Sequence, residues 1–487
     1  HRLPPRPDRQ GALERPPQRR PPLAPTVPAP ATARLRISQE IPVLDAVLVA
    51  HRGQGLALVR DGPEQEALGL LAVGALGVRQ RLQPVHALFD AGITLPPTRL
   101  EVRLLFWGEA VLGTQPGEDG LVVIAGLQQL FQTKQPVIIY PASGTGAWEA
   151  ALVNVMSAGD KVLMFETGHF ASLWNKMAQR LGIEPEFLAL AGDDRATGLP
   201  NSWRHGVQAD LIEQRLRADN DHRIKAVCVV HNETSTGVTS DIAAVRRAID
   251  AAGHPALLMV DTISGLASAD YRHDEWGVDV TISGSQKGLM MPPGISFNAL
   301  SKKAIEASKS ARLPKAFWAW DEILEMNRTG YWPYTPNTNL LYGLSEALDM
   351  LLEQGLPAVF ARHQRWATGV RAAVNAWGLP IQCADSNVYS PVLTGVITPQ
   401  GVDADALRRL IHDRFDLSLG AGLGKLKGRM FRIGHLGDCN DLTLMGALSG
   451  VEMGLKLAGI PMAGSGVAAA MAQFAAEPTA SQCRNNR

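Results

Sequence analysis

The chain has 487 residues, and its 47 basic and 47 acidic side chains balance to a net charge of zero at neutral pH. A chain of this length can form two or more domains with large cores, and the even mixture of charges argues against nucleic acid or an anionic membrane as a partner. No apolar run has the length of a membrane span, and the 4 cysteines show neither metal-ligand spacing nor the density of a disulfide scaffold. We therefore predict a cytoplasmic protein without a metal site.

The N-terminal region, residues 1–124, differs in composition from the rest of the chain. From residue 1 to 126 there is no Lys, Asn, Met, Tyr or Cys, and Ser38 is the only serine. Residues 1–30 are crowded with Pro and Arg, and residues 1–40 have no helical or strand periodicity. We interpret the region as aberrant or disordered, with a wrong reading frame as one explanation, and predict no functional residue in it.

The first motif follows a short apolar strand. Residues 135–140 predict that strand, 141–146 a turn of small residues, and 147–156 a helix. This order can point backbone N–H groups and the positive end of a helix at a phosphate, although a plain strand-to-helix turn has the same residues. The spacing is neither that of a P-loop nor that of a dinucleotide-binding fingerprint. The residues alone leave both alternatives open.

Two further strands end near aromatic or polar residues. Residues 160–165 predict a strand, followed by Phe170 and a helix over 171–181. Residues 224–230 predict a strand covered on both faces, which ends at the polar loop 231–238. Phe170 could stack on a planar ligand, but for a lone aromatic residue packing between helix and sheet is the more common role.

A carboxylate and a lysine follow the next two strands. A helix over 241–252 leads to a strand at 256–260 and then to Asp261, and a strand at 278–282 is followed by a turn and Lys287. Open parallel sheets bind ligands at the carboxyl ends of their strands. Asp261 could serve such a ligand or act only as a helix N-cap. Lys287 could be a desolvated nucleophile or an ordinary surface lysine.

The last part of the chain predicts a second domain. A helix over 340–354 ends at a Gly-Leu-Pro break, where we place the domain boundary. Residues 356–460 predict a smaller α+β domain, and 461–487 a terminal helix with a loose tail. Arg432 lies inside the apolar strand 430–434, and a cation in such a place needs an anionic partner from the protein or from a substrate.

The strand–loop–helix repeats predict a right-handed, mainly parallel α/β domain over residues 125–355. A phosphate-binding turn, a carboxylate and a lysine at its strand ends form a set that suits pyridoxal phosphate. The lysine would hold the aldehyde, the carboxylate would keep the pyridine nitrogen protonated, and the turn would bind the phosphate.

Five motifs follow one another between residues 127 and 457. They are PASGTGAWEAAL (141–152), HNETSTGV (231–238), VDTISGLAS (260–268), SGSQKGLMMPPG (283–294) and MFRIGHLG (430–437). Each motif is weak alone, but the ordered set resembles the class V, fold-type I aminotransferases that depend on pyridoxal phosphate. The serine–glyoxylate and alanine–glyoxylate enzymes are the subgroup that it resembles most.

This resemblance implies a role for each residue near the reacting atoms. Lys287 would form the Schiff base and carry the proton, and Asp261 would pair with the pyridinium nitrogen. Phe170 would stack on the ring, and Thr234 would lie near the ring hydroxyl. Arg432 would bind the substrate carboxylate through two parallel hydrogen bonds.

The resemblance also implies a phosphate site and an assembly. Ser143, Gly144, Thr145 and Gln286 would hold the phosphate, and Thr335 would reach it from a neighbouring subunit of a homodimer or larger homo-oligomer. The reaction implied is transamination from L-serine or L-alanine to glyoxylate, which gives glycine and hydroxypyruvate or pyruvate.

Two alternatives remain beside this reaction. Cysteine desulfuration uses the same fold but needs a nucleophilic cysteine before the arginine strand, and residues 417–428 contain none. An α/β protein that binds pyridoxal phosphate or another ligand without turnover is the second, because the family's Pro-Gly-Pro element is missing from the N-terminal region.

Overall fold

The computed structural model describes residues 46–51, 55–60 and 116–476, and the chain divides into two units at residues 111 and 112. In the first unit, strands β1 (Ala46–His51) and β2 (Gly55–Arg60) pair as an antiparallel hairpin. The rest of the N-terminal region that we interpret as aberrant, up to residue 115, lies outside the described residues.

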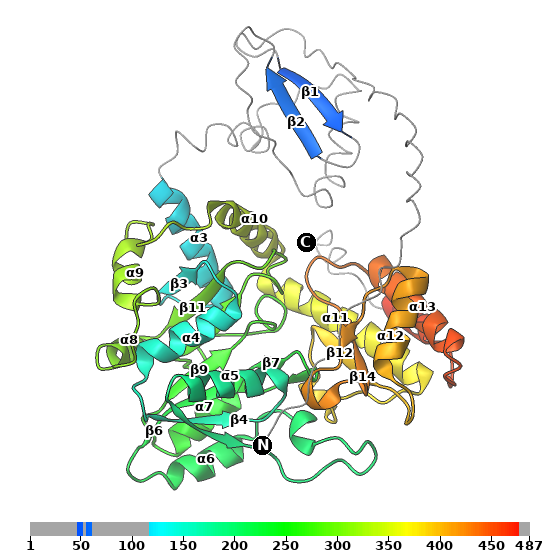
Figure 1. The fold of residues 1–487 in the computed structure, drawn as a ribbon, viewed down its shortest axis with the longest axis horizontal. Helices are drawn as coiled ribbons and strands as arrows, with labels where there is room; N and C mark the ends of the chain where they lie inside the picture. The colour runs from blue at the N-terminus through cyan, green and yellow to red at the C-terminus, as the bar shows by residue number, and fades with distance from the viewer. Residues whose placement is uncertain (1–45, 52–54, 61–115, 477–487) are drawn as a thin grey trace, which may run out of the picture. The chain divides into compact units, whose positions relative to one another are not determined.

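The second unit contains the large domain and the small domain, which Figure 1 shows in cyan to green and in yellow to red. Helix α3 (Pro116–Phe131) crosses the predicted boundary between residues 124 and 125, so the large domain includes residues before 125. Val123, Leu127, Leu130 and Phe131 belong to the domain core, and Gly126 lets the helix approach Leu348. We did not predict this helix from the sequence, because it begins inside the N-terminal region of unusual composition.

The large domain is built on a seven-stranded sheet of order β3-β11-β10-β9-β6-β4-β5. The strands are β3 (Val137–Tyr140), β4 (Lys161–Phe165), β5 (Glu184–Leu188), β6 (Ile224–Val230), β9 (Leu257–Asp261), β10 (Val280–Gly284) and β11 (Ser296–Leu300). Strand β11 runs antiparallel to both of its neighbours, and the other six run in one direction. The predicted mainly parallel α/β class is confirmed.

Helices cover both faces of this sheet, as the ribbon in Figure 1 shows. They are α4 (Gly144–Val155), α5 (His169–Arg180), α6 (Ala209–Arg217), α7 (Ile242–Ala251), α8 (Lys302–Ser308), α9 (Trp320–Asn327) and α10 (Thr338–Gln354), together with α3. In β6, Val227 and Val229 belong to one core cluster, while Ala226, Cys228 and Val230 belong to the other. Side chains of a strand alternate between faces, so both faces of this strand are buried, as predicted.

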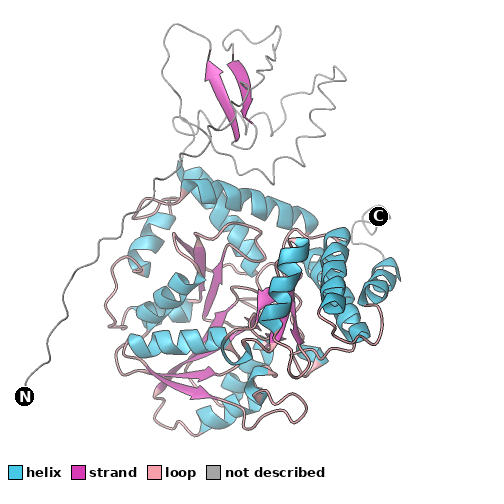
Figure 2. Ribbon diagram, turned by 45° about the vertical axis from the view of Figure 1, so that its right-hand side comes forward, coloured by secondary structure: helices cyan, strands magenta, loops and turns pink. Residues whose placement is uncertain are grey.

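The small domain has a three-stranded antiparallel sheet of order β12-β14-β13, with helices packed beside it (Figure 2). Its elements are α11 (Leu356–Trp377), β12 (Leu393–Ile397), α12 (Ala404–Phe415), β13 (Gly420–Ala421), β14 (Met430–Gly434), α13 (Asp441–Leu457) and α14 (Gly466–Ala476). Ala470 and Phe474 of α14 are buried in the domain core. The structure thus has the predicted terminal helix, and residues 477–487 lie outside the described residues.

Within the described part of the chain, no helix is both long enough and apolar enough to cross a membrane.

Candidate active site

The parallel strands of the large sheet end at one edge, and most of the sequence-predicted site residues follow those ends. Ser143, Gly144 and Thr145 follow β3, Phe170 follows β4, Thr234 follows β6, Asp261 ends β9, and Gln286 and Lys287 follow β10. Arg432 comes from β14 of the small domain. The fold thus brings segments that are far apart in sequence to a common edge.

Asp261 is buried at the end of β9, and its carboxylate accepts two hydrogen bonds. The indole Nε1 of Trp148 donates to Oδ2 at 3.0 Å, and the backbone N of Ile263 donates to Oδ1 at 2.7 Å. Burial, with a smaller effect from the negative charge of Glu233, raises the pKa of Asp261 to about 7, although both hydrogen bonds oppose this. Among the described residues, those directly after Asp261 form turns and no helix, so the N-cap alternative is wrong.

Lys287 is half-buried in the turn after β10, and its pKa is lowered by desolvation and, to a smaller extent, by the positive charge of Arg432. The turn is tightly packed, because a Cβ on Gly288 would stand 2.1 Å from the carbonyl oxygen of Leu266. Met290 adopts a left-handed φ of 62°, which a non-glycine residue holds only where its surroundings require it. Lys287 is therefore placed by a constrained turn and is not an ordinary surface lysine.

Arg432 is fixed by two backbone carbonyls. Its Nε donates to the oxygen of Ala421 at 2.8 Å, and its Nη1 donates to the oxygen of Thr234 at 2.6 Å. Desolvation lowers the pKa of Arg432, and the charge of Glu233 opposes that shift. These bonds connect the small domain to the loop after β6 and orient the guanidinium group.

The turn after β3 is shorter than predicted, because α4 begins at Gly144 and includes residues 145 and 146. A Cβ at Gly144 would stand 2.3 Å from Cδ1 of Ile263, so glycine is needed for the helix to start this close to the end of β9. The predicted glycine-rich loop is therefore the first turn of the helix itself. Its N–H groups and dipole provide the positive end that an anion needs.

Gln286 lies beside this first turn. A Cβ on Gly284 would stand 3.0 Å from Oε1 of Gln286 and 3.3 Å from the backbone N of Gly144. The Oε1 atom is buried without a hydrogen-bond partner, and the exposed Ser143 side chain does not cap α4. An unpartnered amide oxygen calls for a hydrogen-bond donor, and the amide nitrogen of the same side chain is the group that could donate to a phosphate.

Phe170 is half-buried and packs against the core cluster beneath α4 and α5, so the packing role is confirmed while its stacking role stays a prediction. Thr335 is exposed in the loop between α9 and α10, where the hydroxyl of Tyr334 donates to the carbonyl oxygen of Ile139 at 2.9 Å. Its reach into a neighbouring subunit also stays a prediction.

Sequence reasoning missed two residues of the site. Trp148 is fully buried and donates to Asp261, and Glu233 places a buried carboxylate against the first turn of α5. Glu233 had a weak signal, because it lies in the polar loop shortly after a largely apolar strand. Trp148 had none, because an indole inside an apolar helix is normally a packing residue.

The arrangement fits pyridoxal phosphate both at the pyridine nitrogen and at the phosphate group. None of the ion pairs between described residues involves Asp261, so its buried carboxylate lacks a balancing cation that a pyridinium would supply. The helix terminus, the Ser143 hydroxyl and the amide of Gln286 suit a phosphate. Lys287 follows β10, which lies between β3 and β9 in the order of the sheet and pairs with β9, the strand of Asp261.

Comparisons with known proteins agree with this chemistry. The family model of the class-V aminotransferases matches residues 125–379. The chain is 47% identical over 355 residues to the serine–glyoxylate aminotransferase of Methylorubrum extorquens, a match that covers 72% of this chain and 85% of the relative. The L-aspartate–glyoxylate aminotransferase of Paracoccus denitrificans is 43% identical over 365 residues, with 74% and 88% covered. The solved pyridoxamine–pyruvate aminotransferase from Mesorhizobium loti superposes with a TM-score of 0.67 at 26% identity, covering 75% of this chain and 91% of that one.

Proposed function

Because the chain belongs to the class-V aminotransferases, whose cofactor is pyridoxal phosphate, we propose that it transfers the amino group of L-serine to glyoxylate, giving glycine and hydroxypyruvate. The observation that carries the choice of substrates is the 47% identity to a serine–glyoxylate aminotransferase. L-Alanine, which would give pyruvate, is the second donor that we propose.

Bound pyridoxal phosphate supplies an electron sink for the negative charge that forms at the substrate's α-carbon. In this proposal Asp261 keeps a proton on the ring nitrogen, because a cation beside its carboxylate favours the ionised form. The amine of Lys287 would hold the cofactor and would move the proton at the α-carbon. Its lowered pKa suits this role, because more of the amine is neutral near pH 7.

Arg432 orients the substrate in the same scheme. Since its Nε and one Nη1 hydrogen bond go to backbone carbonyls, the outer N–H groups of Nη1 and Nη2 remain to bind a carboxylate end-on. Donor and acceptor both carry a carboxylate next to the reacting carbon, so one arginine serves both half-reactions. The first turn of α4, with Ser143, Gly144 and Thr145, would hold the phosphate together with Gln286. Phe170 and Thr234 would contact the ring.

We further propose a cytoplasmic homodimer or larger homo-oligomer, in which Thr335 contacts the phosphate of the neighbouring subunit. The exposed apolar side chains of Leu121 and Val122 on α3 and of Tyr342 on α10 support a subunit contact. Light scattering measures the assembly, and Thr335→Ala should weaken pyridoxal phosphate binding if the contact forms.

The donor assignment is tested by incubating the protein with glyoxylate and ¹⁵N-labelled L-serine, L-alanine or L-aspartate in parallel, and by measuring ¹⁵N-glycine with mass spectrometry. Serine should give the highest kcat/KM. Faster labelling from aspartate would overturn the choice of donor. Cofactor binding without labelled glycine from any donor would favour the alternative of a binding protein.

A further inference from the structure

Glu233 is a buried carboxylate that no role assigned so far includes. It ends the short strand β7 (Asn232–Glu233), which pairs with β8 (Val238–Thr239), and its side chain is 1% exposed. Desolvation raises the pKa of Glu233, and four donated hydrogen bonds oppose that rise. A group this costly to bury is kept only where it is well partnered.

The partners of Glu233 are the backbone N–H groups at the start of α5. Phe170 N donates to Oε1 at 3.4 Å, and Ala171 N donates to Oε2 at 3.1 Å. The hydroxyl of Ser235 donates to Oε1 at 2.6 Å and accepts from His169 N at 2.8 Å. The first three backbone N–H groups of α5 thus donate either to the Glu233 carboxylate or to the Ser235 hydroxyl that is hydrogen-bonded to it.

The contact is built closely on both sides. A Cβ on Gly168 would stand 2.4 Å from Cγ of Glu233 and 2.5 Å from Oγ of Ser235, so only glycine can precede the helix here. Helix α5 has no acidic residue in its own first turn, and Glu233 supplies from another segment the negative charge that a helix N-terminus favours. The position of Phe170 in this first turn therefore depends on Glu233.

Glu233 is also connected to the small domain. The next residue, Thr234, accepts the 2.6 Å hydrogen bond from Nη1 of Arg432, and the charge of Glu233 acts on the guanidinium group as well. A change in the position of Glu233 would move the carbonyl that fixes the arginine. Glu233 is therefore linked to Phe170 through the first turn of α5 and to Arg432 through the carbonyl of Thr234.

We propose that Glu233 is a positioning residue of this site, whose carboxylate sets the place of Phe170 through the first turn of α5 and the place of Arg432 through the following carbonyl. It touches neither substrate nor cofactor. The effect on cofactor binding, through Phe170, rests only on the family to which the chain belongs. The effect on substrate binding, through Arg432, rests on the proposed function.

Glu452 offers a matched control, because it makes the same kind of contact away from the site. It is 7% exposed in the small domain, where it accepts from the backbone N of Val467 at 3.0 Å, from Ser465 Oγ at 3.0 Å and from Nε1 of Trp377 at 3.0 Å. It thus supports the start of α14 as Glu233 supports the start of α5. A purely structural role at both positions would lower stability in both variants and leave cofactor and donor binding unchanged in both.

The experiment compares Glu233→Gln with Glu452→Gln in the full chain. The amide replaces one acceptor oxygen with a donor that faces an N–H group, so both variants should lower the melting temperature. Only Glu233→Gln should raise the dissociation constant of pyridoxal phosphate, by about tenfold, weaken the induced circular dichroism of the bound cofactor, and raise KM for the amino donor by about tenfold. Glu452→Gln should keep wild-type values for all three.

The proposal is overturned if Glu233→Gln loses stability as Glu452→Gln does while cofactor affinity, circular dichroism and KM stay at wild-type values. If Glu233→Gln does not fold, Ser235→Ala decides, because it removes only the hydroxyl that links Glu233 to His169 N. It should weaken cofactor binding by about threefold, and unchanged binding would contradict the proposal. Cofactor affinity needs no substrate, so failure of the serine–glyoxylate assignment would leave this test intact.

Discussion

Asp261 and Asp279 belong to neighbouring strands and are equally buried, at 4% exposure each, but they lie at opposite edges of the large sheet. Asp279, before β10, accepts from the backbone N of Leu258 at 2.9 Å and from Ser301 Oγ at 2.8 Å, and Nζ of Lys303 lies 3.7 Å away. Asp261, after β9, has two hydrogen bonds but no cation among the described ion pairs. A carboxylate that the protein balances holds the structure together, whereas one left unbalanced is suited to a cationic ligand.

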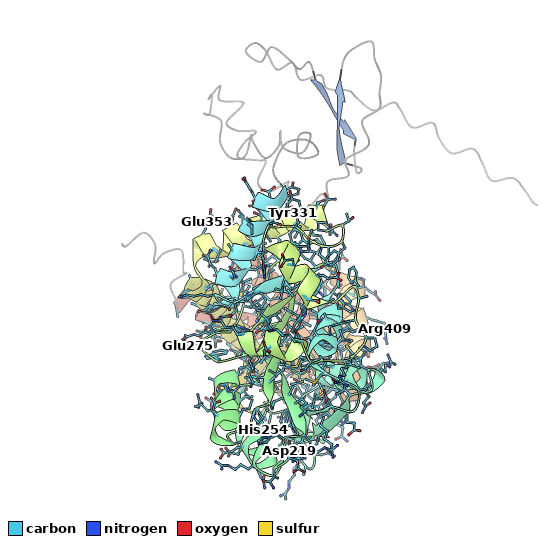
Figure 3. The ribbon with its side chains drawn as sticks, turned by 90° about the vertical axis from the view of Figure 1, so that its left-hand side faces the viewer. Asp219, His254, Glu275, Tyr331, Glu353 and Arg409 are labelled. Carbon is cyan, nitrogen blue, oxygen red and sulfur yellow. The ribbon has the colours of Figure 1, made fainter. Side chains whose placement is uncertain are left out.

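A second carboxylate at the amino-terminal edge, Asp219, is also partnered within the protein. Asp219 and His254, which Figure 3 labels side by side, lie before β6 and β9. Nε2 of His254 is 3.2 Å from Oδ2 of Asp219, which also accepts from the backbone N of Ile224 at 2.7 Å. At the carboxyl edge, by contrast, Gln286 has a buried oxygen without a partner. The carboxylates at the amino-terminal edge are thus partnered by cations or a histidine, whereas Asp261 at the carboxyl edge has no such partner among the described ion pairs.

The largest expected effect is at Lys287. Lys287→Ala removes the amine that binds the cofactor and moves the proton, so turnover should fall by at least about a thousandfold. Pyridoxal phosphate should still bind without a covalent bond, because the phosphate and ring contacts remain. Steady-state kinetics and absorbance of the dialysed variant measure both, and turnover within tenfold of wild type would remove Lys287 from the mechanism.

At the same edge, Asp261→Asn should reduce kcat by about a hundredfold or more, because the neutral amide no longer holds a proton on the ring nitrogen. Folding stability should not fall, since the change removes a buried charge that lacks a counter-charge. The comparison is between kcat and the urea midpoint of the same preparation. A large loss of stability with unchanged kcat would place Asp261 among the structural carboxylates.

Asp279→Asn should give the opposite result. The variant loses a partner of Leu258 N or of Ser301, and the free energy of unfolding should fall by about 1–3 kcal/mol. Cofactor affinity and kcat should stay within twofold of wild type, because the residue is at the other edge of the sheet. Reduced cofactor affinity in this variant would break the division between the two edges.

A smaller effect is the pH dependence of the protein stripped of cofactor. Burial raises the pKa of Asp261 to about 7, above the value of about 4 in an unfolded chain. Between these values the folded state holds a proton that the unfolded state has lost, so this group's stabilising contribution is lost as pH rises from about 4 to 7. The stability gained by Asp261→Asn over wild type should therefore grow with pH, and a pH-independent difference would show that Asp261 is not perturbed.

Much of this arrangement could be predicted from the sequence. The strands at 224–230 and 430–434 are confirmed residue for residue, and the fold-type I class, the aminotransferase family and the cofactor are confirmed by the relatives. Apolar strands with glycine-rich turns carry a strong local signal, because their pattern depends on neighbours in sequence. The helix start at Gly144 could not be predicted, because it depends on a close contact with Ile263 far along the chain.

The missed residues of the site have a similar cause. Trp148 and Glu233 act through partners 113 and 62 residues away, and nothing in their own segments indicates those contacts. Helix α3 was not predicted, because it follows a stretch of unusual composition. The contact that holds it in the domain, its packing on α10, is a tertiary one. Local patterns specify elements and candidate groups, while the tertiary contacts decide which groups are left without a partner.

The most direct test of the central claim is to find which residue carries the cofactor. The protein loaded with pyridoxal phosphate is reduced with borohydride, which makes the link permanent, and is then digested and mapped by mass spectrometry. We expect the label on the peptide that contains Lys287, and the added L-serine should decrease labelling by taking the cofactor off the lysine. A label on another lysine, or none on a protein that binds the cofactor, would contradict the assignment of this edge of the sheet as the active site.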